Sequence, residues 1–351
     1  MADTEETEER FALSASADFA EWLAAMGGSL VLTTYQAGKL LFLGSAPDGK
    51  VTLFERELSR PMGLAVFGEG RGFALATQHQ LYRFENMLPP GGRDSRGFDA
   101  VYVPQVAWLT ASVDAHDVGI GADGRPIFVN TLYSCIAAVS DTRSFRPLWK
   151  PPFIADIARG DRCHLNGMAM ADGRPRYATA VARTDSEDGW RAHRADGGVV
   201  IDVETDAIVA RGLAMPHSPR LHGGRLWLLN SGAGEFGFVD PDSGRFEAVA
   251  FCPGYARGLA FAGNHAIVGL SRPRDGAFSG LPLDEALASR KAEPMCGLLM
   301  IDLESGEIDV WARIEGQVKE LFEVGVLPGI RQPSAIGFKT DEIKQAVSIE
   351  M

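Results

Sequence analysis

Apolar residues along this chain fall into short runs separated by polar turns, and the runs come in pairs. Residues 166–170 and 176–181 form one pair, joined by the turn Ala171-Asp172-Gly173-Arg174, and residues 217–221 and 225–229 form another. Short apolar runs that flank a turn of this composition are typical of β-hairpins. The pattern therefore predicts a chain built almost wholly from strands and turns.

The hairpins are followed by a third and a fourth apolar run, so the sequence repeats in units of roughly 50 residues, a period typical of propeller blades. Six units fill residues 29–335, but the first has only three strands. Residues 320–327 supply its missing innermost strand, which closes the ring and leaves few open sheet edges. We predict an all-β, six-bladed β-propeller closed by pairing a C-terminal strand with the first blade. A β-sandwich of many strands is the alternative.

The two ends and two long loops lie outside this repeat. Residues 1–28 form an acidic lead with one short helix over 11–26, and residues 336–351 form a C-terminal tail. Insertions at 183–197 and 272–294 separate the second and third strands of the fourth and sixth units, and part of the second one, 283–291, has a helical pattern. Both insertions are expected to overhang the same mouth of the central channel, where loops on a rigid scaffold commonly carry function.

Aligning the inner strands by their turns brings polar side chains to equivalent positions in every unit. Side chains two apart in a strand share a face, so two stacked tiers are expected to face the axis. One tier is Met62, His116, Asn166, His217, Arg257 and Phe322. The other, two residues earlier in each unit, is Arg60, Asp114, His164, Met215, Tyr255 and Glu320. Because burying polar groups without partners is costly, these side chains should bond water, a ligand or a metal.

Three imidazoles with nearby carboxylates suit Zn²⁺, Fe²⁺ or a similar divalent ion, with Ca²⁺ less suited. The predicted metal ligands are His116, His164 and His217. The predicted catalytic residues are Asp114, Glu320 and Tyr255, and the predicted substrate-binding residues are Arg257, Asn166, Trp190 and Arg272. A water-filled channel whose histidines bond backbone carbonyls is the alternative. Cys163 precedes His164 and is therefore expected to point into a sheet layer, away from the channel.

The composition limits the classes of partner that this protein is expected to bind. A formal net charge of −12 argues against nucleic acid, whose binding proteins usually present a basic face. No apolar run approaches the ~20 residues of a membrane-spanning helix, so no membrane partner is expected. Four cysteines without a CxxC pair, together with an acidic N-terminus unlike a signal peptide, predict a cytoplasmic protein.

Four stretches carry a resemblance to a known family: residues 30–39 (LVLTTYQAGK), 145–153 (FRPLWKPPF), 162–167 (RCHLNG) and 215–220 (MPHSPR). As a set they resemble an uncharacterised, mainly bacterial family of conserved hypothetical proteins with a domain of unknown function. The six-unit plan is also loosely similar to gluconolactonase-type and amidating-lyase-type propellers, which hold a divalent metal at the channel. The gluconolactonase type uses mainly Glu, Asn and Asp, and the histidine-rich tiers depart from that pattern.

Two functions are consistent with these features. The first is a metal-dependent enzyme, a hydrolase, lyase or oxidoreductase, that acts on a small molecule or peptide at the channel mouth. The second is a non-catalytic propeller that binds a ligand or protein through its insertions. Metal content and the effect of replacing His164 distinguish the two.

Overall fold

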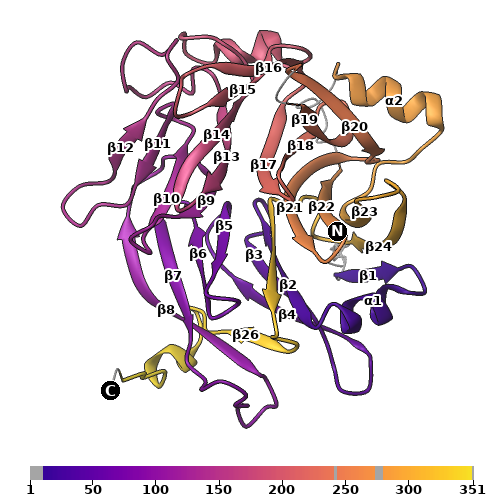
Figure 1. The fold of residues 1–351 in the computed structure, drawn as a ribbon. Coiled ribbons are helices and arrows are strands. Elements are labelled where there is room, and N and C mark those ends of the chain that lie inside the picture. Colours follow the sequence, from indigo (N-terminus) through magenta and orange to yellow (C-terminus); the bar gives the residue numbers. More distant parts are fainter. Residues whose placement is uncertain (1–10, 241–242, 273–279, 350–351) are drawn as a thin grey trace, which may run out of the picture.

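Six sheets surround a central axis in the computed structural model, which describes residues 11–240, 243–272 and 280–349 (Figure 1). The inner strands contact one another in ring order, β5, β9, β13, β17, β21 and β25, and β25 returns to β5. The predicted six-bladed β-propeller is therefore confirmed, and the chain is not a β-sandwich.

The blades follow one another along the chain. Blade 1 contains β25 (Glu323–Pro328), β2 (Gly28–Thr34), β3 (Lys39–Ser45) and β4 (Val51–Glu57). Blade 2 contains β5 (Leu64–Phe67), β6 (Gly72–Ala76), β7 (Gln80–Asn86), β8 (Ala100–Leu109) and β26 (Pro333–Ala335). Blade 3 contains β9 (Ala115–Ile120), β10 (Pro126–Asn130), β11 (Cys135–Ala138) and β12 (Arg146–Trp149).

The remaining blades keep the same plan. Blade 4 contains β13 (Leu165–Ala171), β14 (Arg174–Ala180), β15 (Gly198–Asp202) and β16 (Ile208–Leu213). Blade 5 contains β17 (Pro216–His222), β18 (Arg225–Asn230), β19 (Glu235–Asp240) and β20 (Arg245–Phe251). Blade 6 contains β21 (Tyr255–Ala262), β22 (His265–Ser271), β23 (Gly297–Asp302), β24 (Ile308–Glu315) and β1 (Ala12–Ala15).

Blade 1 combines segments from both ends of the chain. Its innermost strand, β25, runs antiparallel to β2, with Gly28 opposite Pro328 and Thr33 opposite Glu323. Figure 1 shows the yellow β25 beside the indigo strand β2. The hydrogen bonds of this ladder engage backbone groups of β2 that would otherwise form an open sheet edge.

The N-terminal segment differs from the prediction of one helix over residues 11–26. Residues 12–15 instead form β1, which pairs antiparallel with β24 from Ala12 opposite Glu315 to Ala15 opposite Ala312. The shorter helix α1 (Phe19–Ala25) follows and buries Phe19 and Leu23. A strand is favoured at this place because it covers the outer edge of blade 6. The other helix, α2 (Pro282–Arg290), agrees with the predicted helical part of the second insertion. None of the helices in the described segments is long and apolar enough to span a membrane.

Hydroxyl groups tie successive blades together at a repeated position. In four places a Ser or Thr side chain at the end of one blade's second strand donates a hydrogen bond to a backbone carbonyl where the inner strand of the next blade starts. The four donor and acceptor pairs are Thr33 to Met62, Thr131 to Leu165, Ser231 to Ala256 and Ser271 to Leu321, with distances of 2.6, 2.6, 2.6 and 3.0 Å. Each bond gives a partner to a buried backbone carbonyl and fixes the start of an inner strand.

Glycine allows the inner strands to approach closely. A Cβ on Gly167 would lie 2.3 Å from Pro219 Cδ of blade 5, and a Cβ on Gly258 would lie 2.8 Å from the Val324 nitrogen of blade 1. Gly258 also has a φ of +82°, a conformation that other residues adopt at a cost. These two positions must therefore lack a side chain for the ring to be this narrow.

A buried ionic network crosses the axis below the inner tiers. The Arg220 guanidinium of blade 5 donates to both carboxylate oxygens of Asp117 in blade 3, at 2.8 and 3.1 Å, and to Glu323 Oε2 of blade 1, at 3.0 Å. Asp117 and Glu323 are almost fully buried. Their oxygens also accept backbone N–H groups of Met168 in blade 4 and Leu259 in blade 6. One guanidinium thus connects three blades directly, and its two carboxylate partners reach two more.

We predict that Arg220→Met strongly destabilises the fold. The substitution leaves two buried carboxylates without their cation, and breaking a buried pair in this way typically costs about 3–5 kcal/mol. Arg125→Met is the matched control, because Arg125 pairs with Asp141 on the surface, where such pairs contribute little to stability. Urea unfolding at pH 8 measures both variants. Equal midpoints for the two variants would contradict a structural role for the network.

Candidate functional site

One mouth of the channel contains a cavity of about 260 Å³, formed where the inner strands start. Its lining residues are Tyr35, Asp114, His116, Asp161, His164, Trp190, Arg191, Arg194, Met215, Arg257 and Phe322. They come from all blades except the second, and from the first insertion. The two predicted tiers therefore do meet at the axis, and about half of their members line the cavity.

An unusual backbone conformation recurs at this mouth. Arg60, Asp114, His164 and Met215 occupy equivalent positions in blades 2 to 5, and their φ values are 48°, 49°, 50° and 46°. Residues other than Gly adopt this left-handed conformation rarely and at some cost. The conformation turns the chain into each inner strand, so these four residues lie at the channel rim just before the regular strands begin.

The rim carbonyls fix the tautomers of two histidines. His116 Nδ1 lies 3.1 Å from the Asp114 carbonyl oxygen, and His217 Nδ1 lies 2.9 Å from that of Met215. A carbonyl only accepts, so each Nδ1 carries the proton and each Nε2 carries a lone pair. The Thr131 hydroxyl, which donates to the Leu165 carbonyl, also accepts from His116 Nδ1 at 2.8 Å.

His164 is held by a carboxylate. Its Nδ1 lies 2.8 Å from Asp161 Oδ2, the same oxygen that accepts the indole N–H of Trp190 at 3.0 Å. The Trp190 ring stacks on the imidazole at a centroid distance of 4.2 Å. Among the described residues no hydrogen bond reaches Nε2 of His164 or of His116, whose ring lies 4.9 Å away edge-on. Both nitrogens are therefore free to bond a molecule in the cavity.

His217 is different, because both of its ring nitrogens have partners. Its Nε2 accepts the Asn166 amide at 3.2 Å, and Arg257 Nη2 lies 3.5 Å away. The Thr179 hydroxyl donates to Asn166 Oδ1 at 2.8 Å and so orients that amide. Burial and the nearby charge of Arg257 hold the pKa of His217 well below its ordinary value, so the ring is neutral. His217 therefore acts as a support beneath the cavity.

Arg257 places a positive charge at the floor of the cavity. Its guanidinium lies 4.3 Å from the centre of the Phe322 ring and donates to Glu320 Oε1 at 3.3 Å. The side chain is only 8% exposed, and its Nε is buried without a hydrogen-bond partner. Arg191 and Arg194 of the first insertion add cationic groups at the rim. This end of the channel is suited to a ligand with an anionic group.

Two further groups at the mouth have shifted pKa values. Burial, reinforced by the negative charge of Asp161, raises the pKa of Asp114 above its ordinary value. Burial, with the charges of His164 and Arg257, holds the pKa of His116 well below its ordinary value. One carboxyl that keeps its proton more readily thus lies beside an imidazole that stays neutral.

The first insertion lines this mouth, and the described part of the second, which excludes residues 273–279, packs against it. Trp190, in the 3₁₀ helix Gly189–His193, packs in one apolar cluster with Met215, Tyr255 and the α2 residues Leu283 and Leu287. Figure 1 shows α2 at the outer side of blades 5 and 6. Because helix and indole bury each other, the first insertion is held against the channel.

The other predicted site residues lie behind or outside the cavity. Asn166, Tyr255 and Glu320 are buried around it without lining it. Arg272 is exposed, and its backbone N–H donates to the Lys319 carbonyl. Cys163 is buried, and burial raises its pKa to about 12, as expected for a thiol packed in a sheet layer.

The donor atoms of the three predicted metal ligands do not converge in this arrangement. Within the described segments, one set of three His, Cys, Asp or Glu residues has ligand atoms all within 4.8 Å of one another, and it lies on blade 6. His217 Nε2 is already occupied by Asn166, which leaves His116 and His164 with open nitrogens. A metal on these two imidazoles stays a prediction.

Asp161 and Tyr35 are lining residues to which the sequence assigned no role. Asp161 lies three residues before His164, and only the left-handed backbone at both residues, with φ of 41° and 50°, brings its carboxylate back to the imidazole. Tyr35 lies in the turn after β2 and reaches Phe322 at a ring-centroid distance of 5.7 Å. The sequence does place Asp161 between a Gly and the segment Arg162-Cys163-His164. This proximity to His164 was the available indication that Asp161 belongs to the site.

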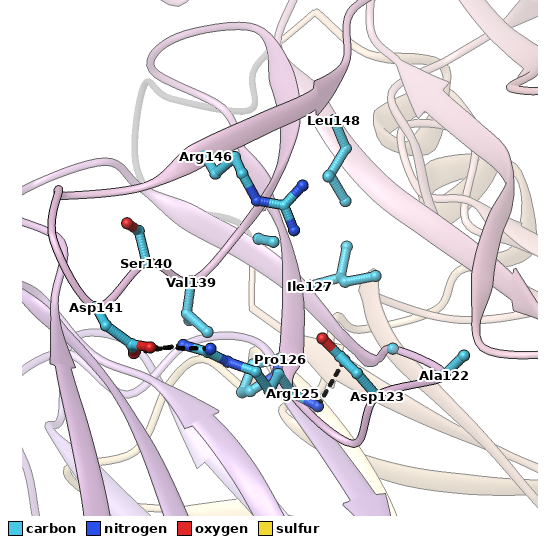
Figure 2. A pocket seen from close by; sticks show the side chains of 12 residues that line it. Ala122, Asp123, Arg125, Pro126, Ile127, Val139, Ser140, Asp141, Arg146 and Leu148 are labelled. Carbon is cyan, nitrogen blue, oxygen red and sulfur yellow. Dashed lines mark hydrogen bonds and ion pairs between the residues drawn. The ribbon is translucent and has the colours of Figure 1, made fainter.

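A second hollow, of about 410 Å³, lies on the outer strands of blade 3 (Figure 2). Figure 2 shows Arg125 directed at Asp141, and the two form a two-armed ion pair. Asp123 and Arg146, which carry opposite charges, also line this hollow. Since Arg125 and Asp141 neutralise each other, this hollow has less convergent chemistry than the channel mouth.

Comparisons place the chain among propellers without naming an activity. The sequence profile of a family described as a domain of unknown function (DUF4915) matches residues 17–336. No curated protein matches the sequence. A chain of a nidogen–laminin complex is similar in structure, with 11% identity, a TM-score of 0.53, and coverage of 86% of this chain and 99% of the other.

Two bacterial structures are more distant. Virginiamycin B lyase from Staphylococcus aureus has 13% identity and a TM-score of 0.40, over 74% of this chain and 96% of its own. TolB from Acinetobacter baumannii has 11% identity and a TM-score of 0.48, over 88% of this chain and 67% of its own. These likenesses concern the fold alone.

We predict that acidification below about pH 6.5, the ordinary histidine pKa, destabilises the wild type more than His217→Gln. The folded-state pKa of His217 is lowered, so its contribution is complete above the unfolded pKa and is lost as pH falls below it. One such group contributes up to about 1.4 kcal/mol per pH unit. Thermal unfolding between pH 5 and 8 measures the difference, with His222→Gln, which replaces a half-buried ring stacked on Phe261, as the control. Parallel curves for wild type and His217→Gln would disprove it.

Proposed function

We propose, for a chain that belongs to the family with the domain of unknown function DUF4915, that the channel mouth is the active site of an enzyme acting by proton transfer on a small anionic molecule. The observation that carries this proposal is the Asp161–His164 pair, whose open Nε2 adjoins the cavity. A carboxylate on one imidazole nitrogen fixes the tautomer and makes the other nitrogen a proton acceptor.

His164 has the features of a general base. Its Nδ1 proton is held by Asp161, and a positive charge on the ring after proton uptake would be stabilised by that carboxylate. The stacked Trp190 keeps the ring plane fixed. A base that is already held in one orientation does not have to reorganise when the substrate binds. Much of the rate acceleration by such groups comes from this fixed positioning.

Asp114 and His116 complete the proton-transfer groups. The raised pKa of Asp114 favours its acid form, which can return a proton to a leaving group. His116 stays neutral and offers its Nε2 as a hydrogen-bond acceptor for a substrate hydroxyl or amine. An acid and a base at one rim are the usual arrangement for hydrolysis or elimination.

Arg257 is proposed to orient the substrate. It is held from behind by Glu320 and lies against the Phe322 ring, so its position is fixed before binding. An anionic group of the substrate is expected between Arg257 and the rim residues Arg191 and Arg194. The reacting part of the substrate is then expected beside His164, near the Trp190 ring that stacks on it.

No step of this proposal uses a metal. A divalent ion on His116 and His164 would supply a Lewis acid, but Asn166 holds the third predicted ligand, His217. The alternative proposal is a propeller that binds a ligand or protein at this mouth without converting it.

We predict that His164→Gln strongly slows turnover while the chain stays folded. The full-length protein is incubated with a pool of small carboxylates, hydroxy acids, esters and lactones, and each compound is followed by mass spectrometry. Depletion of at least one compound by the wild type, slowed about 10²–10⁴-fold in the variant, is expected for loss of a general base. His193→Gln is the matched control, since His193 is exposed in the same insertion and does not line the cavity. Binding without depletion by the wild type would favour the non-catalytic alternative.

We also predict that Asp161→Asn lowers kcat and changes KM little. The amide of Asn can donate to His164 Nδ1, which favours the wrong tautomer, as it does in other carboxylate–histidine pairs. Steady-state kinetics on the compound found above separates the two constants. A variant that raises KM alone would show that Asp161 serves binding and not proton transfer.

A further inference from the structure

A compact set of metal-ligating side chains lies on blade 6, away from the channel mouth. His265 begins β22 and stands directly opposite Asp302, which ends β23, and Asp309 lies near the start of β24. One ligand atom from each residue lies within 4.8 Å of the other two. Three neighbouring strands of one sheet thus bring an imidazole and two carboxylates to a single point.

The surrounding residues hold two of these groups in place. Asp302 Oδ1 accepts the backbone N–H of Ser305 at 2.7 Å, and Oδ2 accepts the Asn264 amide at 2.6 Å. The Trp22 ring of α1 contacts the His265 ring edge-on, with centroids 5.9 Å apart. Supported side chains of this kind lose little freedom when they bind an ion.

The charges at this point are not balanced by the protein. His265 Nε2 lies 3.0 Å from Asp309 Oδ2, and among the described residues neither carboxylate forms an ion pair with a Lys or Arg. Two carboxylates beside one imidazole leave an excess of negative charge at this point.

We propose that His265, Asp302 and Asp309 bind a divalent transition-metal ion such as Zn²⁺ or Co²⁺. One nitrogen and two oxygen donors suit these ions better than Ca²⁺ or Mg²⁺, which prefer oxygen ligands alone. The ion takes the place of the proton between His265 and Asp309, and that proton moves to the other ring nitrogen or to solvent. Asp309 is exposed, so water can reach the remaining positions around the ion. The ion would connect β22, β23 and β24 beside α1.

The test is titration of the full-length, chelator-treated protein with CoCl₂ by visible absorption and with ZnCl₂ by calorimetry. One saturable equivalent is expected, and His265→Gln and Asp309→Asn should each weaken binding at least tenfold. His222→Gln is the matched control, because His222 is a partly exposed histidine that stacks on Phe261. Thermal unfolding in chelator checks that every variant is folded.

Three results would overturn the proposal. They are the absence of saturable binding, unchanged affinity in both blade 6 variants, and binding that is lost in His164→Gln but kept in His265→Gln. The last result would place the ion at the channel mouth, where the sequence predicted it. Because the two sites share no residue, failure here leaves the proposed proton-transfer function intact.

Discussion

The guanidinium of Arg220 is the constraint on which the narrow ring depends. A propeller of four-stranded sheets is held at its centre mainly by contacts between inner strands, which are short and each belong to a different blade. Arg220 bonds Asp117 and Glu323 across the axis, and their oxygens also accept backbone N–H groups of two further blades. Burial, opposed by Arg220 and reinforced by Asp117, raises the pKa of Glu323 to about 7. Arg220 is therefore the cation that both buried carboxyl groups share.

This network also gives the channel a floor. The cavity at the opposite mouth, of about 430 Å³, has Arg220 in its lining and is otherwise mostly apolar, with Met168, Met170 and Phe261 among its residues. It shares no residue with the cavity around His164. The polar mouth is therefore a separate pocket, in which a ligand meets Arg257 and the two imidazoles. The cavity at the other mouth offers no comparable set of polar groups.

The sequence predicts the part of this structure that repeats. Turn spacing aligned the inner strands, so the approach of His116, His164 and His217 to one axis followed from local pattern alone. The repeat pattern could not predict contacts that depend on a particular backbone conformation or on a partner far away in the sequence. Asp161 reaches His164 because both residues are left-handed, and Arg220 pairs with Asp117, 103 positions earlier. Residues 12–15 form a strand because they pair with the open edge of β24. The local propensity of these residues carries no information about that distant edge.

Equivalent positions in a repeat need not have equivalent roles, and the three histidines show why. His116 and His217 share the same tier, and a rim carbonyl fixes the same tautomer in each. What differs is the neighbour on the Nε2 side: Asn166 occupies this nitrogen in His217, whereas that of His116 adjoins the cavity. Blade 4 carries Asn166 where blades 3 and 5 carry histidine, and its own histidine stands two residues earlier, at the rim, against Asp161. One substitution within the repeat therefore makes His217 a support and leaves His164 and His116 open to a ligand.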